Sequence, residues 1–142
     1  MKKYGGFLVS QIGRKSSRIW ERLLKEYEID AFNGAQGRIL YVLWEHENLT
    51  ITDIARLTSM ANTTLTSMLD RMEDEGLVRR VHDNVNRRQI FVSVTEKAKA
   101  YREEYEQISD SMNNIFYSGF SETEIADFES QLRRILKNLE EN

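Results

Sequence analysis

Several residue types on which protein chemistry often depends are absent from this chain of 142 residues or scarce in it. There is no cysteine, which excludes disulfides, thiolate metal sites and cysteine-based peroxide sensing. An unbroken apolar segment is also missing, because the N-terminal region leads into an amphipathic pattern that carries Arg14, Lys15, Arg18 and Arg22. We therefore expect no signal peptide, no membrane span and a cytoplasmic protein.

Little in the sequence could carry catalysis. The only histidines, His46 and His82, do not fall in a metal-binding spacing, and the seven glycines are dispersed, so no phosphate-binding loop is indicated. Carboxylates occur in runs such as 73–75, which are typical of solvated helix faces. We predict that the protein is not an enzyme and that it has no catalytic residue, no metal site and no cofactor.

The middle of the chain predicts two short helices followed by a hairpin. Thr50 can cap the first helix, which we expect to end near Thr58, and the second helix is expected from about 62 to 75. Gly76 stands where a left-handed residue closes a helix, and β-branched and aromatic residues on both sides of the polar segment 83–88 predict the hairpin. This order is the layout of a winged helix-turn-helix, whose second helix enters a DNA major groove.

The outward face of the second helix carries side chains that suit base edges and phosphate oxygens, and the hairpin tip carries two arginines. Two adjacent arginines are most often a solvated turn, but an arginine beside a recognition helix can enter the narrow minor groove. The charge distribution favours DNA, because residues 76–95 carry four arginines and one acid although the net charge of the chain is −3. The predicted DNA-binding residues are Thr50, Thr52, Asn62, Thr63, Thr64, Thr66, Ser67, Arg71, Asn86, Arg87 and Arg88.

Apolar residues recur at helical spacing near both ends of the chain. They predict a long first helix, a continuous helix over 98–115, and a last helix that opens with a capping box at 121–124. Such helices can pack as an intramolecular bundle. A twofold dimer would instead place the two groove-entering helices, here called reader helices (62–75 in each copy), about one DNA turn apart. We therefore expect a homodimer with a dimerisation region at 1–32 and 96–142 and a DNA-binding lobe at 33–95.

Several stretches, taken together, resemble the MarR family of bacterial transcription regulators. They are the segment 70–80, the wing residues 86–88, the closing 94–97, and 36–43, which looks like the family's second helix. The resemblance implies a mainly α (α+β) fold, with a winged helix-turn-helix, a two-stranded wing and a helical dimerisation region. It also implies a homodimeric repressor that binds double-stranded DNA at a pseudo-palindromic operator and is released by a small anionic or phenolic effector.

Three positions depart from the family pattern. Asn86 stands where the wing usually has an aspartate, and Ser67 stands where many relatives have an arginine in the recognition helix. The second helix starts at Asn33 instead of with a proline, although an asparagine cap with glutamine three residues later serves the same purpose. The base preference of relatives therefore cannot be transferred to this chain.

The resemblance further implies a ligand cleft between the dimerisation helices and the DNA-binding lobe, where a bound ligand would change the spacing of the two reader helices. Aromatic residues at helical spacing belong to a core more often than to a pocket, and Arg38 could instead pair with an acid or hold a phosphate. A second interpretation of the whole chain is a winged-helix protein–protein interaction module without DNA readout. The candidate effector-binding residues are Ile12, Trp20, Arg38, Tyr41, Trp44 and Tyr105.

Overall fold

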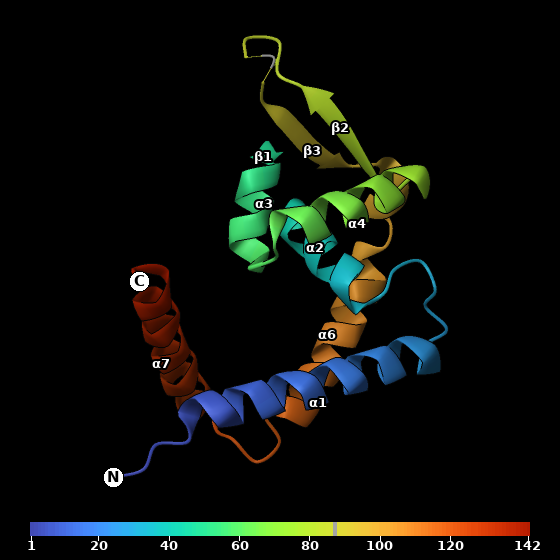
Figure 1. The fold of residues 1–142 in the computed structure, drawn as a ribbon. Helices are drawn as coiled ribbons and strands as arrows, with labels where there is room; N and C mark the ends of the chain where they lie inside the picture. Colours follow the sequence, from blue (N-terminus) through green and yellow to red (C-terminus); the bar gives the residue numbers. More distant parts are fainter. Residues whose placement is uncertain (87) are drawn as a thin grey trace.

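The structure is a computed structural model that describes residues 1–86 and 88–142. Most of the chain is helical, and a small sheet extends from one end of the molecule (Figure 1). The predicted winged helix-turn-helix is confirmed, because its helices and strands follow one another in the expected order. In chain order the elements are α1 (Gly5–Glu26), α2 (Gly34–Glu45), β1 (Leu49–Thr50), α3 (Ile51–Thr58), α4 (Asn62–Asp74), β2 (Val78–His82), β3 (Ile90–Val94), α5 (Glu96–Lys99), α6 (Arg102–Phe116) and α7 (Glu122–Glu140).

Side-chain caps explain where several helices begin. At α2 the carboxamide oxygen of Asn33 accepts from the backbone N–H of Gln36 at 2.8 Å, and the side chain of Gln36 accepts from the N–H of Asn33 at 3.1 Å. Reciprocal capping boxes of this kind also open α3 and α7. Gly76 follows α4 with a φ of +77°, a left-handed conformation that glycine adopts without strain. The predicted caps and helix end are confirmed.

The sheet has one strand more than the sequence predicts. β2 and β3 form the expected antiparallel hairpin, in which Arg80 lies opposite Val92 and His82 lies opposite Ile90. The two-residue strand β1 pairs with the other edge of β3, which gives the strand order β1-β3-β2. The predicted two-stranded wing is confirmed as β2 and β3. The additional strand β1 was not predicted, because a two-residue strand has no detectable alternation.

The core of the lobe lies between α2, α3, α4 and the sheet. Leu65, Leu69 and Met72 of α4 are fully buried, as are Ile54 of α3 and, almost completely, Val92 of β3. These apolar side chains fix which side of α4 faces inward. The opposite side of α4 is therefore presented to solvent.

The helix predicted over 98–115 is interrupted, so the expectation of one continuous helix was wrong. After α5 the backbone N–H of Tyr101 donates to the carbonyl of Ala98 at 3.1 Å, a tighter turn than that of an α-helix. Ala98 is fully buried, and the ring of Tyr101 lies 6.3 Å from that of Phe32. No proline or glycine marks the interruption, so packing of these two side chains decides it.

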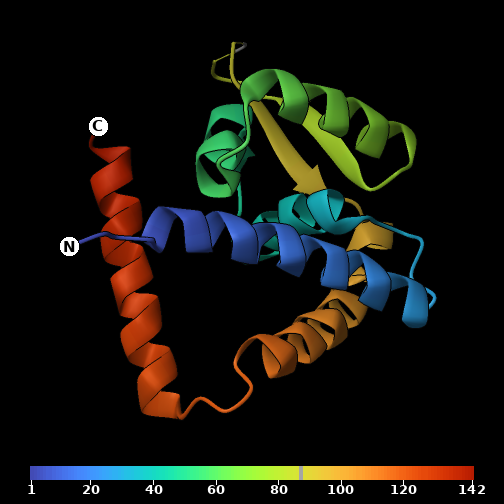
Figure 2. The ribbon, with the colours of Figure 1, turned by 60° about the horizontal axis from the view of Figure 1, so that its bottom comes forward.

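The terminal helices leave apolar faces uncovered. α1 crosses α6, whereas α7 stands away from the lobe and has no buried residue (Figures 1 and 2). Phe7 of α1 and Leu139 of α7 are 66% and 68% exposed in the single chain. Although α1 and α7 are long, no helix within residues 1–86 and 88–142 combines the length and apolar character needed to cross a membrane.

Candidate DNA-reading face and the adjoining cavity

The outer face of α4 carries most of the predicted DNA-binding side chains. The turn after α3 reverses the chain at Ser59, which has a left-handed φ of 56°, and α4 then starts at Asn62. Leu65 and Leu69 are buried and Met68 is half-buried, whereas the polar positions of the first two turns are exposed. The exposed predicted residues of α4 are Asn62, Thr63, Thr64, Thr66, Ser67 and Arg71.

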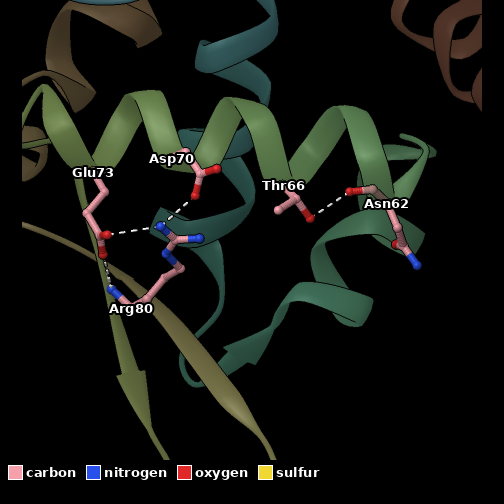
Figure 3. A network of polar contacts seen from close by, with 5 residues as sticks. All are labelled: Asn62, Thr66, Asp70, Glu73 and Arg80. Carbon is pink, nitrogen blue, oxygen red and sulfur yellow. Dashed lines mark hydrogen bonds and ion pairs between the residues drawn. The ribbon is translucent and has the colours of Figure 1, made fainter.

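Thr66 has only part of its hydrogen-bonding capacity free. Its hydroxyl donates to the backbone carbonyl of Asn62 at 2.8 Å, one turn earlier (Figure 3). The hydroxyl oxygen remains available as an acceptor, and the side chain also offers its methyl group. An acceptor and a methyl group suit a cytosine amino group and a thymine methyl group, respectively.

Of the two predicted threonines around the start of α3, one is occupied by the helix itself. The hydroxyl of Thr50 accepts from the N–H of Asp53 at 3.1 Å, and the Asp53 carboxylate accepts from the N–H of Thr50 at 3.0 Å. These hydrogen bonds from the Thr50 backbone and side chain lower the pKa of Asp53. Thr52 is exposed and free of such a role.

The wing tip places Arg88 in solvent and uses Asn86 to shape the backbone. The carboxamide oxygen of Asn86 accepts from the backbone N–H of Arg88 at 3.1 Å, and its carbonyl accepts from the N–H of Gln89 at 3.0 Å. An asparagine that bonds the backbone two residues later forms an Asx turn. Asn86 thus orients the chain that carries Arg88. Arg87 lies outside the described residues.

A further arginine, which sequence reasoning passed over, joins α4 to the wing. Arg80 of β2 contacts Asp70 and Glu73 of α4, and the three side chains form the network of Figure 3. The hydrogen bonds and charges of the two acids raise the pKa of Arg80, and Arg80 in turn lowers the pKa of Glu73. The only hint in the sequence was the order of charges, acids on the helix and arginines just after Gly76.

A second feature is a cavity of about 210 Å³ at the junction of α1, α2 and α6. It contains three predicted effector residues, Trp20, Arg38 and Tyr105. Arg38 is exposed, and among the described residues no ion pair engages it. The other residues that line the cavity are Ser16, Ser17, Glu21, Gly34 and Met112.

Tyr105 is the centre of an aromatic cluster behind this cavity. Its ring centroid lies 5.3 Å from that of Trp20, 5.6 Å from Tyr41 and 5.4 Å from Trp44. Tyr41 and Trp44 pack against Tyr105 but do not line the cavity, and neither does Ile12, which is exposed in an earlier turn of α1. Burial raises the pKa of Tyr105 to about 12.

Glu21 links the two halves of the molecule at this cavity. Its carboxylate, on α1, accepts from the backbone N–H of Gly34 at the start of α2, at 2.8 Å. A Cβ at Gly34 would lie 2.6 Å from Oε1 of Glu21 and 3.1 Å from Cδ1 of Trp20, so a side chain there would displace the Glu21 carboxylate from this contact. The sequence contains no local signal for this contact, since it joins residues that lie in different helices.

Comparisons with known proteins agree with a winged helix-turn-helix over α3, α4 and the β2–β3 wing, here called the reader unit. A model of the MarR family matches residues 32–90. The organic hydroperoxide resistance transcriptional regulator of Bacillus subtilis (strain 168) is 29% identical over 133 residues, which cover 94% of this chain and 87% of that protein. The crystal structure of transcriptional regulator PA3341 has a TM-score of 0.83 and 31% identity, over 98% of this chain and 100% of that one. A mutant MarR from E. coli, complexed with operator DNA, has a TM-score of 0.80 and 23% identity, over 92% of each chain.

The exposed reader helix, the arginine-bearing wing and these likenesses define a winged-helix DNA-binding regulator of transcription. The chain belongs to the MarR family. Its relatives are named as transcriptional regulators, which confirms the prediction that the protein is not an enzyme.

Proposed function

We propose that this regulator is a homodimeric repressor that binds a pseudo-palindromic operator and is released by a small ligand. In this proposal α4 enters the major groove, and the wing reaches the adjacent minor groove through Arg88 and Arg87. The observation that carries it is the exposed polar half of α4, which begins at Asn62, together with the exposed Arg88 in the turn between β2 and β3. A protein with this activity acts in the cytoplasm, where its DNA is found.

The uncovered apolar faces of α1 and α7 support the dimer. Phe7, Ile135 and Leu139 are each at least half exposed in the single chain, although their spacing is that of a buried helix face. A second copy that covers these faces would build the dimerisation region from 1–32 and 96–142. The two reader helices would then meet successive turns of an inverted repeat.

The cavity supports release by a ligand, because helices from two regions with different proposed roles meet there. α1 and α6 belong to the proposed dimerisation region, whereas α2 belongs to the DNA-binding lobe. A ligand that contacts Trp20 and Arg38 bridges both regions and so biases their relative placement. A small anionic or phenolic compound fits the exposed cation of Arg38 and the aromatic wall. A hydroperoxide would have to act without thiol oxidation, because the chain has no cysteine.

DNA reading is tested by selection from random double-stranded oligonucleotides, followed by affinity measurements over a range of salt concentrations. We expect enrichment of an inverted repeat. Arg88→Ala should weaken binding to it and reduce the slope of log affinity against log salt by about one, as for one lost phosphate contact. Arg22→Ala, an exposed arginine of α1 that pairs with Glu26, is the matched control and should leave the slope unchanged. Binding without sequence enrichment would overturn the proposal.

Ligand binding is tested by a thermal-shift screen of small aromatic acids and phenols. A ligand at 100 times its dissociation constant should stabilise the protein by about 2.7 kcal/mol. Trp44→Phe leaves Trp20, which lines the cavity, as the only tryptophan, so its fluorescence reports occupancy directly. A stabilising compound that neither alters this fluorescence nor weakens operator binding would contradict the assigned site.

A further inference from the structure

One side of α4 changes character along its length. Asn62 and Thr66 lie towards its start, and Asp70 and Glu73 follow on the same side at helical spacing (Figure 3). The first two residues are proposed DNA contacts, whereas the other two are carboxylates on the helix that enters the groove. Carboxylates repel DNA phosphates, so an uncovered pair here opposes the approach of α4 to DNA.

Arg80 of β2 reaches across to both carboxylates. Its Nη2 lies 2.7 Å from Oδ1 of Asp70 and donates to Oε1 of Glu73 at 3.0 Å. The backbone N–H of Arg80 donates to the other oxygen of Glu73, also at 3.0 Å. Glu73 is therefore held by the main chain and the side chain of the same residue. These contacts attach the first strand of the wing to the second half of the recognition helix.

The exposures of the three side chains suggest what each presents to DNA. The side chain of Arg80 is 24% exposed, compared with 59% for Asp70 and 39% for Glu73. The guanidinium is thus engaged by protein partners and partly covered, unlike that of Arg88 at the wing tip. Its planar group of donors suits two carboxylates at once, which a lysine ammonium would match less well.

We propose that Arg80 is a positioning residue of the DNA interface, which covers the charges of Asp70 and Glu73 so that α4 can enter the groove. This inference rests on the DNA-reading function proposed above. Arg80 acts on affinity through the two acids and does not itself bind a phosphate.

The decisive experiment compares Arg80→Met with its rescue by neutral partners. DNA affinity is measured by fluorescence anisotropy on the selected operator, and the free energy of unfolding is measured by urea titration. Arg80→Met should bind about tenfold more weakly, the scale expected for two uncovered unit charges near phosphates in a water-like dielectric. Adding Asp70→Asn and Glu73→Gln to Arg80→Met should restore most of the lost affinity. The restored affinity should not be accompanied by restored stability, because the ion pairs remain absent.

The acids can also be tested with Arg80 in place, which covers the case in which Arg80→Met fails to fold. Asp70→Asn with Glu73→Gln should bind the operator more tightly than the wild type, since two repulsive charges are gone and the cation of Arg80 is released from its ion pairs.

Arg102→Met is the control that matches Arg80→Met in net charge. Arg102 also contacts two acids, Glu45 at 2.6 Å and Glu106 at 3.2 Å, but it lies on α6, outside the reader unit. Its replacement should leave DNA affinity unchanged.

Two results would overturn the inference. In one, neutralising the acids leaves the affinity of Arg80→Met as low as before, which would assign Arg80 a direct DNA contact or a role in folding alone. In the other, the variant with neutral acids and native Arg80 binds no more tightly than the wild type. Either result leaves wild-type binding intact, whereas failure of the proposed function would appear as a wild type that selects no DNA sequence.

Discussion

Truncation of Leu139 should weaken the proposed dimer strongly, and the structure allows the size of the effect to be worked out. Leu139 lies in the last turns of α7 and is 68% exposed in the single chain. Burying a whole leucine side chain contributes ~1.5–3 kcal/mol, so covering its exposed part contributes about 1 to 2 kcal/mol per protomer. A twofold interface contains each residue twice, so Leu139→Ala should cost the dimer about 3 kcal/mol, or ~100-fold in its dissociation constant.

Sedimentation equilibrium over a range of protein concentrations measures this constant, and circular dichroism checks that the helices are retained. Leu57→Ala is the matched control, because Leu57 is also a partly exposed leucine, at 38%, but lies on α3 outside the terminal helices. It should leave the dimer unchanged. The reasoning is refuted if Leu139→Ala keeps both its helix content and the wild-type dissociation constant, or if Leu57→Ala weakens the dimer equally.

Two further predictions concern the packing around Tyr105. A Cβ at Gly37 would lie 3.2 Å from ring carbons of both Phe32 and Tyr105. Overpacking of this kind costs ~1–3 kcal/mol, whereas replacing a helical glycine with alanine gains only ~1 kcal/mol. Gly37→Ala should therefore lower the free energy of unfolding by about 1 kcal/mol. Urea titration of both variants measures this free energy. Gly13→Ala is the control and should stabilise the protein, because a Cβ at Gly13 meets nothing within 4 Å. An equal gain in stability for both variants would contradict the tight contact at Gly37. The pKa of Tyr105 is raised to about 12 by burial, so its contribution to stability should be complete below about pH 10, where an unfolded tyrosine ionises, and fall as the pH rises towards 12. In a pH titration followed by tyrosinate absorbance, native Tyr105→Phe should therefore lack one of the phenols that ionise at the highest pH. A titration curve that matches the wild type at high pH would contradict the burial of this phenol.

Much of the reader unit could be predicted from the sequence because its signals are local. A cap such as Thr50 with Asp53, a left-handed glycine such as Gly76, and the spacing of Leu65 and Leu69 each act within a few residues. These features fixed the order of the helices and of the hairpin. The polar outer face of α4 followed directly, since a helix with one buried stripe must expose the other.

The features that were missed depend on contacts between distant residues. The interruption before α6 arises where Ala98 and Tyr101 pack into the lobe, although the apolar pattern runs through it without a break. β1 is a strand only because β3 lies beside it. The two residues of β1 are too few to show the alternation of a strand, so pairing with a distant segment cannot be predicted from them.

The same division applies to the site. By itself the sequence determined a winged-helix reader with polar side chains on α4 and an arginine at the wing tip, because secondary-structure period decides which side chains face solvent. Only the tertiary structure decided that Arg80 engages the acids of the recognition helix and that Glu21 caps the start of α2. Both contacts require two elements to meet at hydrogen-bond distance, and that meeting is set by the packing of the whole chain.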